Sequence, residues 1–579
     1  MKNRRKAREL TLQILYQADI RRVPVEDVSE NIFRRYLFKS EVEQFCRRLT
    51  QGTSQYSSSL DLLIKKYARN WSLDRIAAID RNILRFALYE LFFLPEIPPV
   101  VSINEAVEIA KRYGVSDSGK FVNGILDQIR KERCSDSPLN WNNLEKTLRK
   151  NPDLTFLKQI KHEKKIYLVG GCLRDLLLNK EIKDFDLVID DPHFELAEEV
   201  ARLKKGKSVV LSPQLRRVVL PSGFFIDFHL QSSSTLLQDL IKRDFTIDAL
   251  SLDLDSVSQP ALFLIDPSSG LEDLIEKRIR LIRPQSIDED PLRMLRAFRL
   301  ASQLRFDLND EIQKLIIEKA PYLNQCSGER IRDELFLLLR NSFFFPYLNS
   351  PAMKTILKEA IGMEPHPDNL IKLKELLSNE QFLPREYKEK ISTHLKKILS
   401  GERKREELLK LIALFCSFPP REEEKNKITS RLRLAGKEKR VIEQILTLLP
   451  ETQELKNKSF NSLSYARILS RSKEETVELS LLLPVLAPQD ENNYALSSSL
   501  LRTFFDKYSL IMSPPKLLSG DDLIESLQLP RGQWLSQILE EIRLAQIADQ
   551  VTTKKEALEL ATKHMKERKN QRKELSEEK

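Results

Sequence analysis

Two aspartates separated by a single residue, Asp184 and Asp186, carry the clearest chemistry in this sequence. Apolar residues alternate with them over residues 184–189, which is typical of a β-strand whose side chains point to its two faces in turn. Both carboxylates therefore lie on one face, where they repel each other unless a cation lies between them. Hard oxygen ligands of this kind favour Mg²⁺. Two solvated acids on an exposed face would give the same short pattern, so the neighbouring residues have to decide between the two interpretations.

A turn with two glycines precedes this pair. Gly170 and Gly171 follow a β-rich segment, residues 166–169, and lead into a helical segment, residues 173–178. Glycines between a strand and the start of a helix let backbone amides approach a phosphate closely. A glycine pair alone usually marks only a turn. Followed so closely by paired aspartates, it favours a site for a metal and a phosphorylated substrate.

A third carboxylate, Asp227, lies inside an otherwise apolar strand, residues 224–228. Burying an acid without a partner is costly. A position on an edge strand would explain it, but a third metal ligand beside Asp184 and Asp186 explains it better. Three carboxylates and two Mg²⁺ ions are what an in-line nucleotidyl transfer requires, because one ion activates the attacking hydroxyl and the other neutralises the leaving pyrophosphate.

The elements that position these side chains change along the chain. The only convincing sheet is predicted between residues 164 and 265, from β-rich segments at 166–169, 185–189, 208–211, 216–220 and 224–230. The first 132 residues show helical spacing of apolar side chains, and helices return from about residue 275 to about residue 563. The predicted fold class is an all-α N-terminal domain, an α/β head on a small mixed sheet, and a mostly α-helical neck, body and tail.

One helix of the N-terminal region is predicted in more detail. Ser102 and Glu105 have the spacing of a capping box, in which each side chain bonds the backbone amide of the other residue. The helix that they would open continues through Lys111 and would end at Gly114 in a left-handed conformation.

Composition adds a partner class and excludes others. The length of 579 residues predicts roughly three to five domains. Lys and Arg exceed Asp and Glu by 95 to 85, which suits a polyanionic partner, with nucleic acid as the first candidate. Five widely spaced cysteines indicate neither a disulfide framework nor a zinc site. No signal peptide and no apolar run of about 18 residues is found, so we expect a cytoplasmic protein without a membrane segment.

Four ordered motifs resemble those of the bacterial tRNA nucleotidyltransferase and poly(A) polymerase family, in its class II, CCA-adding type. They are residues 170–175 with 184–186, residues 242–249, residues 266–273 and residues 289–296. Residues 328–335 are similar to the neck sequence of this family, and residues 519–532 to its tRNA-contacting tail. The resemblance runs from about residue 160 to about residue 565 and implies a head with a polymerase-β-like palm.

The resemblance also implies roles for single residues. It places metal binding on Asp184 and Asp186, while Asp227 is a further catalytic candidate on the ground of its place in the apolar strand alone. Nucleotide binding is implied for Gly170, Gly171, Arg174, Arg243, Asp244, Asp290 and Arg293. Of these, Arg243 would contact the triphosphate, Asp244 the ribose hydroxyl, and Asp290 with Arg293 the base edge. The implied cofactors and substrates are two Mg²⁺ ions with CTP, ATP or both, and the implied macromolecular partner is tRNA.

The sequence departs from this family in two places. Asp248 stands where the family usually has Asn. The segment between Asp227 and Leu240 is short and lacks the longer, Arg-rich loop that is associated with the change from C addition to A addition. Addition of CC only or of A only therefore stays open beside full CCA addition, and a poly(A) polymerase is the competing enzyme.

The N-terminal region resembles a second family, the NusB transcription antitermination factors, over about residues 3 to 130. The matching segments are residues 4–9, 80–85, 103–106 and 120–127. The resemblance implies an all-helical module that binds single-stranded RNA and pairs with a small ribosomal protein in an antitermination complex. Its RNA face would include Arg4, Arg5, Lys6, Arg8, Lys120 and Phe121. An antitermination factor whose second half only holds RNA is the non-catalytic alternative, and the intact Asp184 and Asp186 speak against it.

Together these observations predict six consecutive parts. They are a NusB-like domain (1–133), a linker (134–150), a nucleotidyltransferase head (151–275), a neck that contacts base and RNA (276–340), a helical body and tail that bind tRNA (341–565) and a charged, disordered end (566–579).

Overall fold

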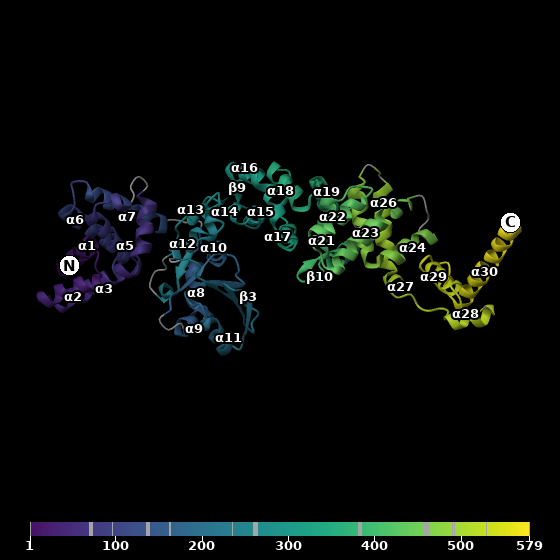
Figure 1. The fold of residues 1–579 in the computed structure, drawn as a ribbon, viewed down its shortest axis with the longest axis horizontal. Helices are drawn as coiled ribbons and strands as arrows, with labels where there is room; N and C mark the ends of the chain where they lie inside the picture. The colour runs from purple at the N-terminus through teal and green to yellow at the C-terminus, as the bar shows by residue number, and fades with distance from the viewer. Residues whose placement is uncertain are drawn as a thin grey trace. The chain divides into compact units, whose positions relative to one another are not determined.

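The structure is a computed structural model (Figure 1). It describes residues 2–68, 73–94, 96–134, 139–160, 164–233, 236–258, 264–379, 385–456, 462–488, 490, 492–528 and 530–577. Residue contacts divide the chain into two units. Unit 1 consists of residues 1–286 with 306–312, and unit 2 of residues 287–305 with 313–579.

The N-terminal part of unit 1 is helical, as the sequence predicts (Figure 1). Its helices are α1 (Lys2–Arg21), α2 (Val25–Arg35), α3 (Ser40–Gln55), α4 (Ser57–Tyr67), α5 (Ala78–Phe93), α6 (Pro99–Tyr113) and α7 (Ser118–Cys134). The core lies around α5, where Ile83, Leu84 and Ala87 are almost completely buried. Helix α1 packs against both α3 and α5. The apolar side chains that recur at helical spacing in this part of the sequence therefore form the core of the domain.

The predicted capping box is wrong. Helix α6 begins at Pro99, earlier than expected, so Ser102 lies inside the helix. Proline is favourable at the first helical position because its missing N–H has no partner there in any case. The hydroxyl of Ser102 instead donates to Glu90 Oε1 on α5, at 2.6 Å. The left-handed end is also wrong, since Gly114 is extended, with φ −91° and ψ −170°.

The head contains a seven-stranded mixed sheet in the order β3-β4-β5-β2-β1-β6-β7. The strands are β1 (Ile166–Val169), β2 (Asp184–Ile189), β3 (Lys207–Ser212), β4 (Leu215–Val219), β5 (Phe225–Leu230), β6 (Ser251–Asp253) and β7 (Leu264–Ile265). All five predicted strands are present within a residue or two. Neighbouring strands are antiparallel except β2 and β5, which are parallel.

Two faces of this sheet differ in exposure. Phe185 and Leu187 are completely buried on one face, whereas Asp184 and Asp186 on the other are partly exposed. Helices α10 (Gly171–Leu177) and α11 (Glu195–Leu203) pack on the sheet. The alternation predicted from the sequence therefore places both carboxylates on the more open face.

Part of the predicted linker belongs to the head. Of residues 134–150, residues 135–138 lie outside the described part, and residues 141–150 form helix α8 (Trp141–Lys150), which packs against α10. Leu144 and Leu148 of this helix are buried, and Asn143 Nδ2 donates to the carbonyl of Leu176 at 2.9 Å. Helix α9 (Pro152–Ile160) follows.

The head is completed by short elements after β5. These are α12 (Leu236–Ile241), the 3₁₀ turns η2 (Thr246–Asp248) and η3 (Leu254–Ser258), α13 (Gly270–Ile275), and the parallel pair of β8 (Arg278–Ile279) with β9 (Asp307–Leu308).

Unit 2 is almost wholly helical. Its longer helices include α15 (Arg293–Leu304), α17 (Gly328–Arg340), α18 (Pro351–Ile361), α20 (Arg385–Leu395), α21 (Arg405–Phe415), α23 (Gly436–Gln453), α25 (Thr476–Leu486), α26 (Asn492–Asp506) and α29 (Trp534–Ile547). The antiparallel strands β10 (Ile398–Ser400) and β11 (Arg403–Lys404) form a hairpin. The disordered end expected at 566–579 is helical instead, because α30 runs from Lys554 to Glu577, and residues 578–579 lie outside the described part.

One buried ionic cluster connects the helices of unit 2. Glu478 of α25 is 2% exposed, and both of its oxygens lie 3.1 Å from His394 Nε2 of α20. Arg405 of α21 donates to the same carboxylate at 2.8 Å. Within the described residues, no helix is long and apolar enough to cross a bilayer.

Candidate active site

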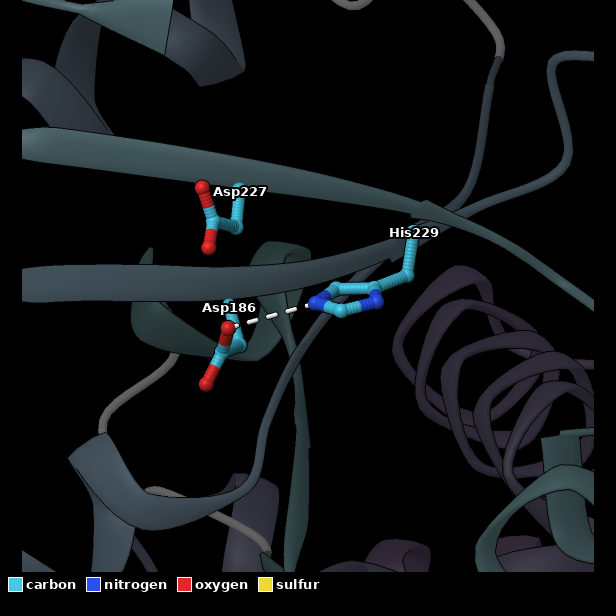
Figure 2. Close-up of side chains that lie close together, drawn as sticks. All are labelled: Asp186, Asp227 and His229. Carbon is cyan, nitrogen blue, oxygen red and sulfur yellow. Dashed lines mark hydrogen bonds and ion pairs between the residues drawn. The ribbon is translucent and has the colours of Figure 1, made fainter. Parts of the chain in front are cut away.

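The register of the parallel pair brings two of the predicted carboxylates together. Asp186 of β2 is paired with Asp227 of β5, so both side chains leave the sheet on the same face. Figure 2 shows the two carboxylates side by side, with the ring of His229 directed at Asp186. Ligand atoms of Asp186, Asp227 and His229 all lie within 4.8 Å of one another. His229 Nε2 is 3.2 Å from Asp186 Oδ1.

Negative charge is concentrated at this place. Burial raises the pKa of Asp184 above its ordinary value, and the nearby charges of Asp186 and Asp227 raise it further. A divalent cation would relieve the repulsion between Asp184 and the carboxylates beside it. The donor set of Asp186, Asp227 and His229 therefore fits a metal ion. Asp184, also predicted as a ligand, lies near enough to feel the charges of Asp186 and Asp227 but is not among the three residues whose ligand atoms lie within 4.8 Å of one another.

Asp227 has a partner that the sequence did not reveal. Arg217, opposite it on β4, donates to both of its oxygens, with Nε to Oδ1 at 2.7 Å and Nη2 to Oδ2 at 2.6 Å. This bidentate pair explains how a carboxylate that is only 5% exposed is stabilised within a strand.

The glycine turn lies directly against these groups. Gly170 has φ +79°, a conformation that strains other residues. A Cβ atom at Gly170 would lie 3.0 Å from Arg243 Nη1 and 3.3 Å from Asp186 Oδ2. The turn thus brings the guanidinium of Arg243 and the carboxylate of Asp186 close to a backbone position without a side chain, and Gly171 begins helix α10.

Arg243 has spare hydrogen-bonding capacity. Its Nε is buried, and no described residue accepts a hydrogen bond from it. Nη1 makes only a long contact, 3.4 Å, to the carbonyl of Asp248. A buried donor without an acceptor is rare in proteins, so the geometry favours an anionic group at this place. Next to it, Asp244 is 9% exposed and accepts from the backbone N–H of Phe245 at 3.0 Å.

Asp248, where the related family usually has Asn, is paired with another predicted residue. Arg174 is 8% exposed and donates to Asp248 and to Asp175. Burial would lower the pKa of Arg174, but Asp248 and Asp175 together hold it above its ordinary value. Arg174 therefore holds helix α10 against η2.

The third sequence motif has a structural function. Asp266 accepts from the backbone N–H groups of Gly270 and Leu271, at 2.7 and 3.0 Å, which caps helix α13. The completely buried Asp273 accepts from the hydroxyl of Thr246 at 2.5 Å. Motif three thus holds the segment that carries Arg243 and Asp244.

The two residues assigned to the base edge lie in unit 2. Asp290 precedes α15 and accepts from Arg330 of α17 at 2.9 Å. Arg293 begins α15, and its side chain is 14% exposed, with Nη1 at 3.5 Å from Glu289.

The predicted RNA face is only partly exposed. Arg4, Arg5 and Lys6 on α1 are exposed, with Arg5 paired to Glu105 of α6 at 2.8 Å. Arg8, by contrast, is 3% exposed and donates to both oxygens of the equally buried Glu90.

The other two residues of that face open a different helix. Lys120 is exposed and Phe121 is half-buried near the start of α7, which packs on α5 and α6. The burial of Arg8 does not fit a phosphate contact, whereas the exposed positions of Arg4, Arg5, Lys6 and Lys120 allow one. The half-buried ring of Phe121 could contact a base but not a phosphate.

Sequence reasoning missed His229 and Arg217. His229 lies two residues after Asp227, so the strand period alone places it on the face of the carboxylates. Arg217 could not be found in this way, because its position depends on the pairing of β4 with β5.

Comparison with known proteins finds different relatives for the N-terminal domain and for the head. Residues 5–131 match the NusB family, and residues 166–219 and 226–280 match the poly A polymerase head domain. The transcription antitermination protein NusB of Elusimicrobium minutum is 44% identical over 138 residues, which are 23% of this chain and 96% of that protein.

Relatives of the second part extend far beyond the head. A CC-adding tRNA nucleotidyltransferase of Synechocystis is 28% identical over 419 residues, which are 68% of this chain and 92% of that protein. Among solved structures, a CCA-adding enzyme in complex with ATP matches 76% of this chain and 98% of its own, at 21% identity and a TM-score of 0.57. The Thermotoga maritima CCA-adding enzyme complexed with tRNA matches 73% and 98%, at 22% identity and a TM-score of 0.50. The two structures establish a shared fold.

A mixed sheet with acidic residues on its open face, a glycine turn before them and a helical body after them define the class of this chain as a nucleotidyltransferase. Its N-terminal domain, residues 5–131, belongs to the NusB family, and residues 166–219 and 226–280 of its head match the poly A polymerase head domain.

Proposed function

We propose that this chain adds C residues to the 3′ ends of tRNA, with its NusB-family domain binding single-stranded RNA. The observation that carries the proposal is the arrangement of Asp184, Asp186 and Asp227 on one sheet face, next to a glycine turn and the unpaired Nε of Arg243. That arrangement suits a triphosphate whose α-phosphorus is attacked by a hydroxyl.

Each part of the site has a stated role in this reaction. Two Mg²⁺ ions held by Asp184 and Asp186, with Asp227 beside them, would activate the attacking 3′-hydroxyl and neutralise the leaving pyrophosphate. The backbone at Gly170 and Gly171 lets the triphosphate approach closely, and Arg243 donates to its oxygens. Asp244 accepts from the ribose hydroxyl, which selects ribonucleotides.

Selection of the base is assigned to Asp290 and Arg293. A carboxylate acceptor beside a guanidinium donor matches the edge of cytosine. The shortness of residues 231–235, between β5 and α12, favours C addition over a change to A addition, because it leaves no long loop to rearrange near the site. The Synechocystis relative, named as CC-adding, supports this choice.

The NusB-family domain supplies a second RNA contact. Arg4, Arg5 and Lys6 present positive charge to solvent on α1, and Lys120 with Phe121 offer a further charge and an aromatic ring on α7. These groups suit phosphates and stacked bases of single-stranded RNA. Pairing with a small ribosomal protein and a function in transcription antitermination belong to the same proposal.

Incubation with tRNAs that end before, within and after the CCA sequence, with one nucleoside triphosphate at a time, tests the proposal. We expect CTP to extend tRNAs that lack the two C residues and ATP to extend none of them. Addition of A to tRNA ending in CC would indicate full CCA addition. Long A tails on unrelated RNA would indicate a poly(A) polymerase. Absence of any incorporation by a protein that binds RNA would indicate a non-catalytic antitermination factor.

A further inference from the structure

A histidine adjoins the carboxylates of the active site without an assigned role. His229 lies on β5 two residues beyond Asp227, on the same face of the sheet. Its side chain is 35% exposed, and its ring points at Asp186 (Figure 2). The third member of the group whose ligand atoms lie within 4.8 Å of one another is thus an imidazole nitrogen rather than the oxygen of Asp184.

The separation of the two atoms fits a shared ion. Ligand atoms at right angles around a cation, each about 2.1 Å from it, lie about 3 Å apart. His229 Nε2 and Asp186 Oδ1 are 3.2 Å apart, which is close to such an edge. A simple hydrogen bond has the same length, so a distance alone does not distinguish a ligand from a hydrogen-bond donor.

The hydrogen bonds of Asp227 favour His229 as a metal ligand over His229 as a hydrogen-bond donor only. Both oxygens of Asp227 already accept short hydrogen bonds from Arg217, which offsets its charge and restrains its orientation. His229, in contrast, is partly exposed and faces the acidic group from the same strand. The donor best able to turn toward an ion at Asp186 is therefore the imidazole.

We propose that His229 Nε2 is a ligand of the divalent ion held by Asp186, an inference that rests on the nucleotidyltransferase function proposed above. A site with mixed oxygen and nitrogen donors differs in selectivity from one built of carboxylates alone. Imidazole binds first-row transition ions well and Mg²⁺ poorly, so His229 shifts the preference of the site toward Mn²⁺. It is a specificity-determining residue for the metal.

Direct metal binding tests this proposal without relying on activity. Mn²⁺ is titrated into the full chain and followed by electron paramagnetic resonance, and pulsed measurements detect coupling between the bound Mn²⁺ and ¹⁴N. We expect a nitrogen coupling in the unmodified protein and its loss in His229→Gln, whose amide keeps a donor for Asp186 but is a poor metal ligand. The Mn²⁺ dissociation constant should rise on the order of tenfold, as it does when even a supporting contact of a metal ligand is removed. The Mg²⁺ constant should change less.

The controls separate this inference from the proposed function. His193→Gln changes an exposed histidine of the same domain and should keep both the coupling and the affinity. Mn²⁺ binding that requires Asp186 but shows no nitrogen coupling, or an unchanged Mn²⁺ to Mg²⁺ preference in His229→Gln, would overturn the role of His229 alone. Mn²⁺ binding that survives Asp186→Asn would overturn the metal site on which the proposed function depends.

Discussion

At the scale of single residues, Asp186 connects three features of the head. Its Oδ2 lies against the glycine turn, its Oδ1 faces His229, and its strand is paired with that of Asp227. A side chain in this position should matter more for chemistry than for folding, because it is 31% exposed and lies on the more open face of the sheet.

Replacing Asp186 with Asn tests this directly. Loss of a ligand to a two-metal site removes several kcal/mol of transition-state stabilisation, so nucleotide incorporation should fall about a thousandfold or more. Single-turnover incorporation and thermal unfolding measure the two effects, and unfolding should change little. Asp190→Asn, just beyond the same strand and exposed, should keep its activity. Incorporation within tenfold of the original rate would remove Asp186 from the active site.

Arg243 gives a prediction about substrate binding. In Arg243→Gln, the buried Nε donor that we assign to the triphosphate is lost. Hydrogen bonds to charged groups contribute about 1.5–3 kcal/mol, so the dissociation constant for CTP should rise about tenfold to a hundredfold. Equilibrium binding of CTP without RNA is the measurement. The exposed Arg202 of α11 provides the matched control, Arg202→Gln, and equal weakening in both would show that only net charge matters.

At the scale of elements, helix α1 combines two kinds of arginine. Arg8→Ala would leave the buried Glu90 carboxylate without its ionic partner, with the hydroxyl of Ser102 still donating to it, which costs about 3–5 kcal/mol. Urea unfolding of residues 1–134 should show this loss. Arg4→Ala, at an exposed position, should change stability by less than about 0.5 kcal/mol but reduce the log–log salt slope for single-stranded RNA by about 0.7. The reverse pattern would show that Arg8 faces the RNA.

The ionic cluster of α20, α21 and α25 makes unit 2 sensitive to acid. Burial would raise the pKa of Glu478, but the hydrogen bond from His394 and the charge of Arg405 hold it below its ordinary value. A lowered carboxyl pKa stabilises the fold above the unfolded pKa of about 4.5, and this contribution is lost as the pH falls through the folded value.

Glu478→Gln should therefore flatten the dependence of stability on pH below about pH 5. The free energy of unfolding in urea, measured across the acidic range, gives the slope. The matched control is Glu423→Gln, which changes an exposed glutamate whose pKa is lowered by the neighbouring Lys427. If the free energy of unfolding depends on pH as steeply in Glu478→Gln as in Glu423→Gln, the cluster does not set the acid sensitivity.

Strands and helices could be predicted to different depths from the sequence. The five strands are bounded by turn residues and alternate clearly, so their positions were predictable. The start of α6 was not, because Pro99 competes with Ser102 for the first turn and only the structure shows that Glu90 takes the hydroxyl. A local sequence pattern considers one possible helix start by itself, whereas in the folded chain the helix start also depends on hydrogen bonds to other helices.

The candidate site shows the same limit. Asp184 and Asp186 follow from the strand period, and so would His229 relative to Asp227. That β5 lies beside β2, and β4 beside β5, is a matter of strand order, which no local pattern contains. The pairing of Arg217 with Asp227, and the contact of His229 with Asp186, could therefore be found only in the structure.

At the scale of the whole molecule, the border between the NusB-family domain and the nucleotidyltransferase can be tested by truncation. Residues 139–579 contain α8 and the complete head, so this fragment should extend tRNA without the NusB-family domain. Starting at residue 151 removes α8 with the buried Leu144 and Leu148, each worth about 1.5–3 kcal/mol, so that fragment should be markedly less stable. Thermal unfolding and tRNA extension measure both. A well-folded but inactive 139–579 fragment would make the NusB-family domain part of the catalytic machinery.

The parallel pairing of β2 with β5 has a consequence for when the metal site forms during folding. The hairpin of β3 and β4, and then β4 with β5, can pair between neighbours along the chain. Asp186 and Asp227 meet only when the chain has returned past that hairpin and β5 has joined β2. Contacts that close a long loop form late. Metal affinity should therefore arise only after β5 has joined β2, so a divalent ion would report on this pairing during folding and stabilise only molecules that have formed it.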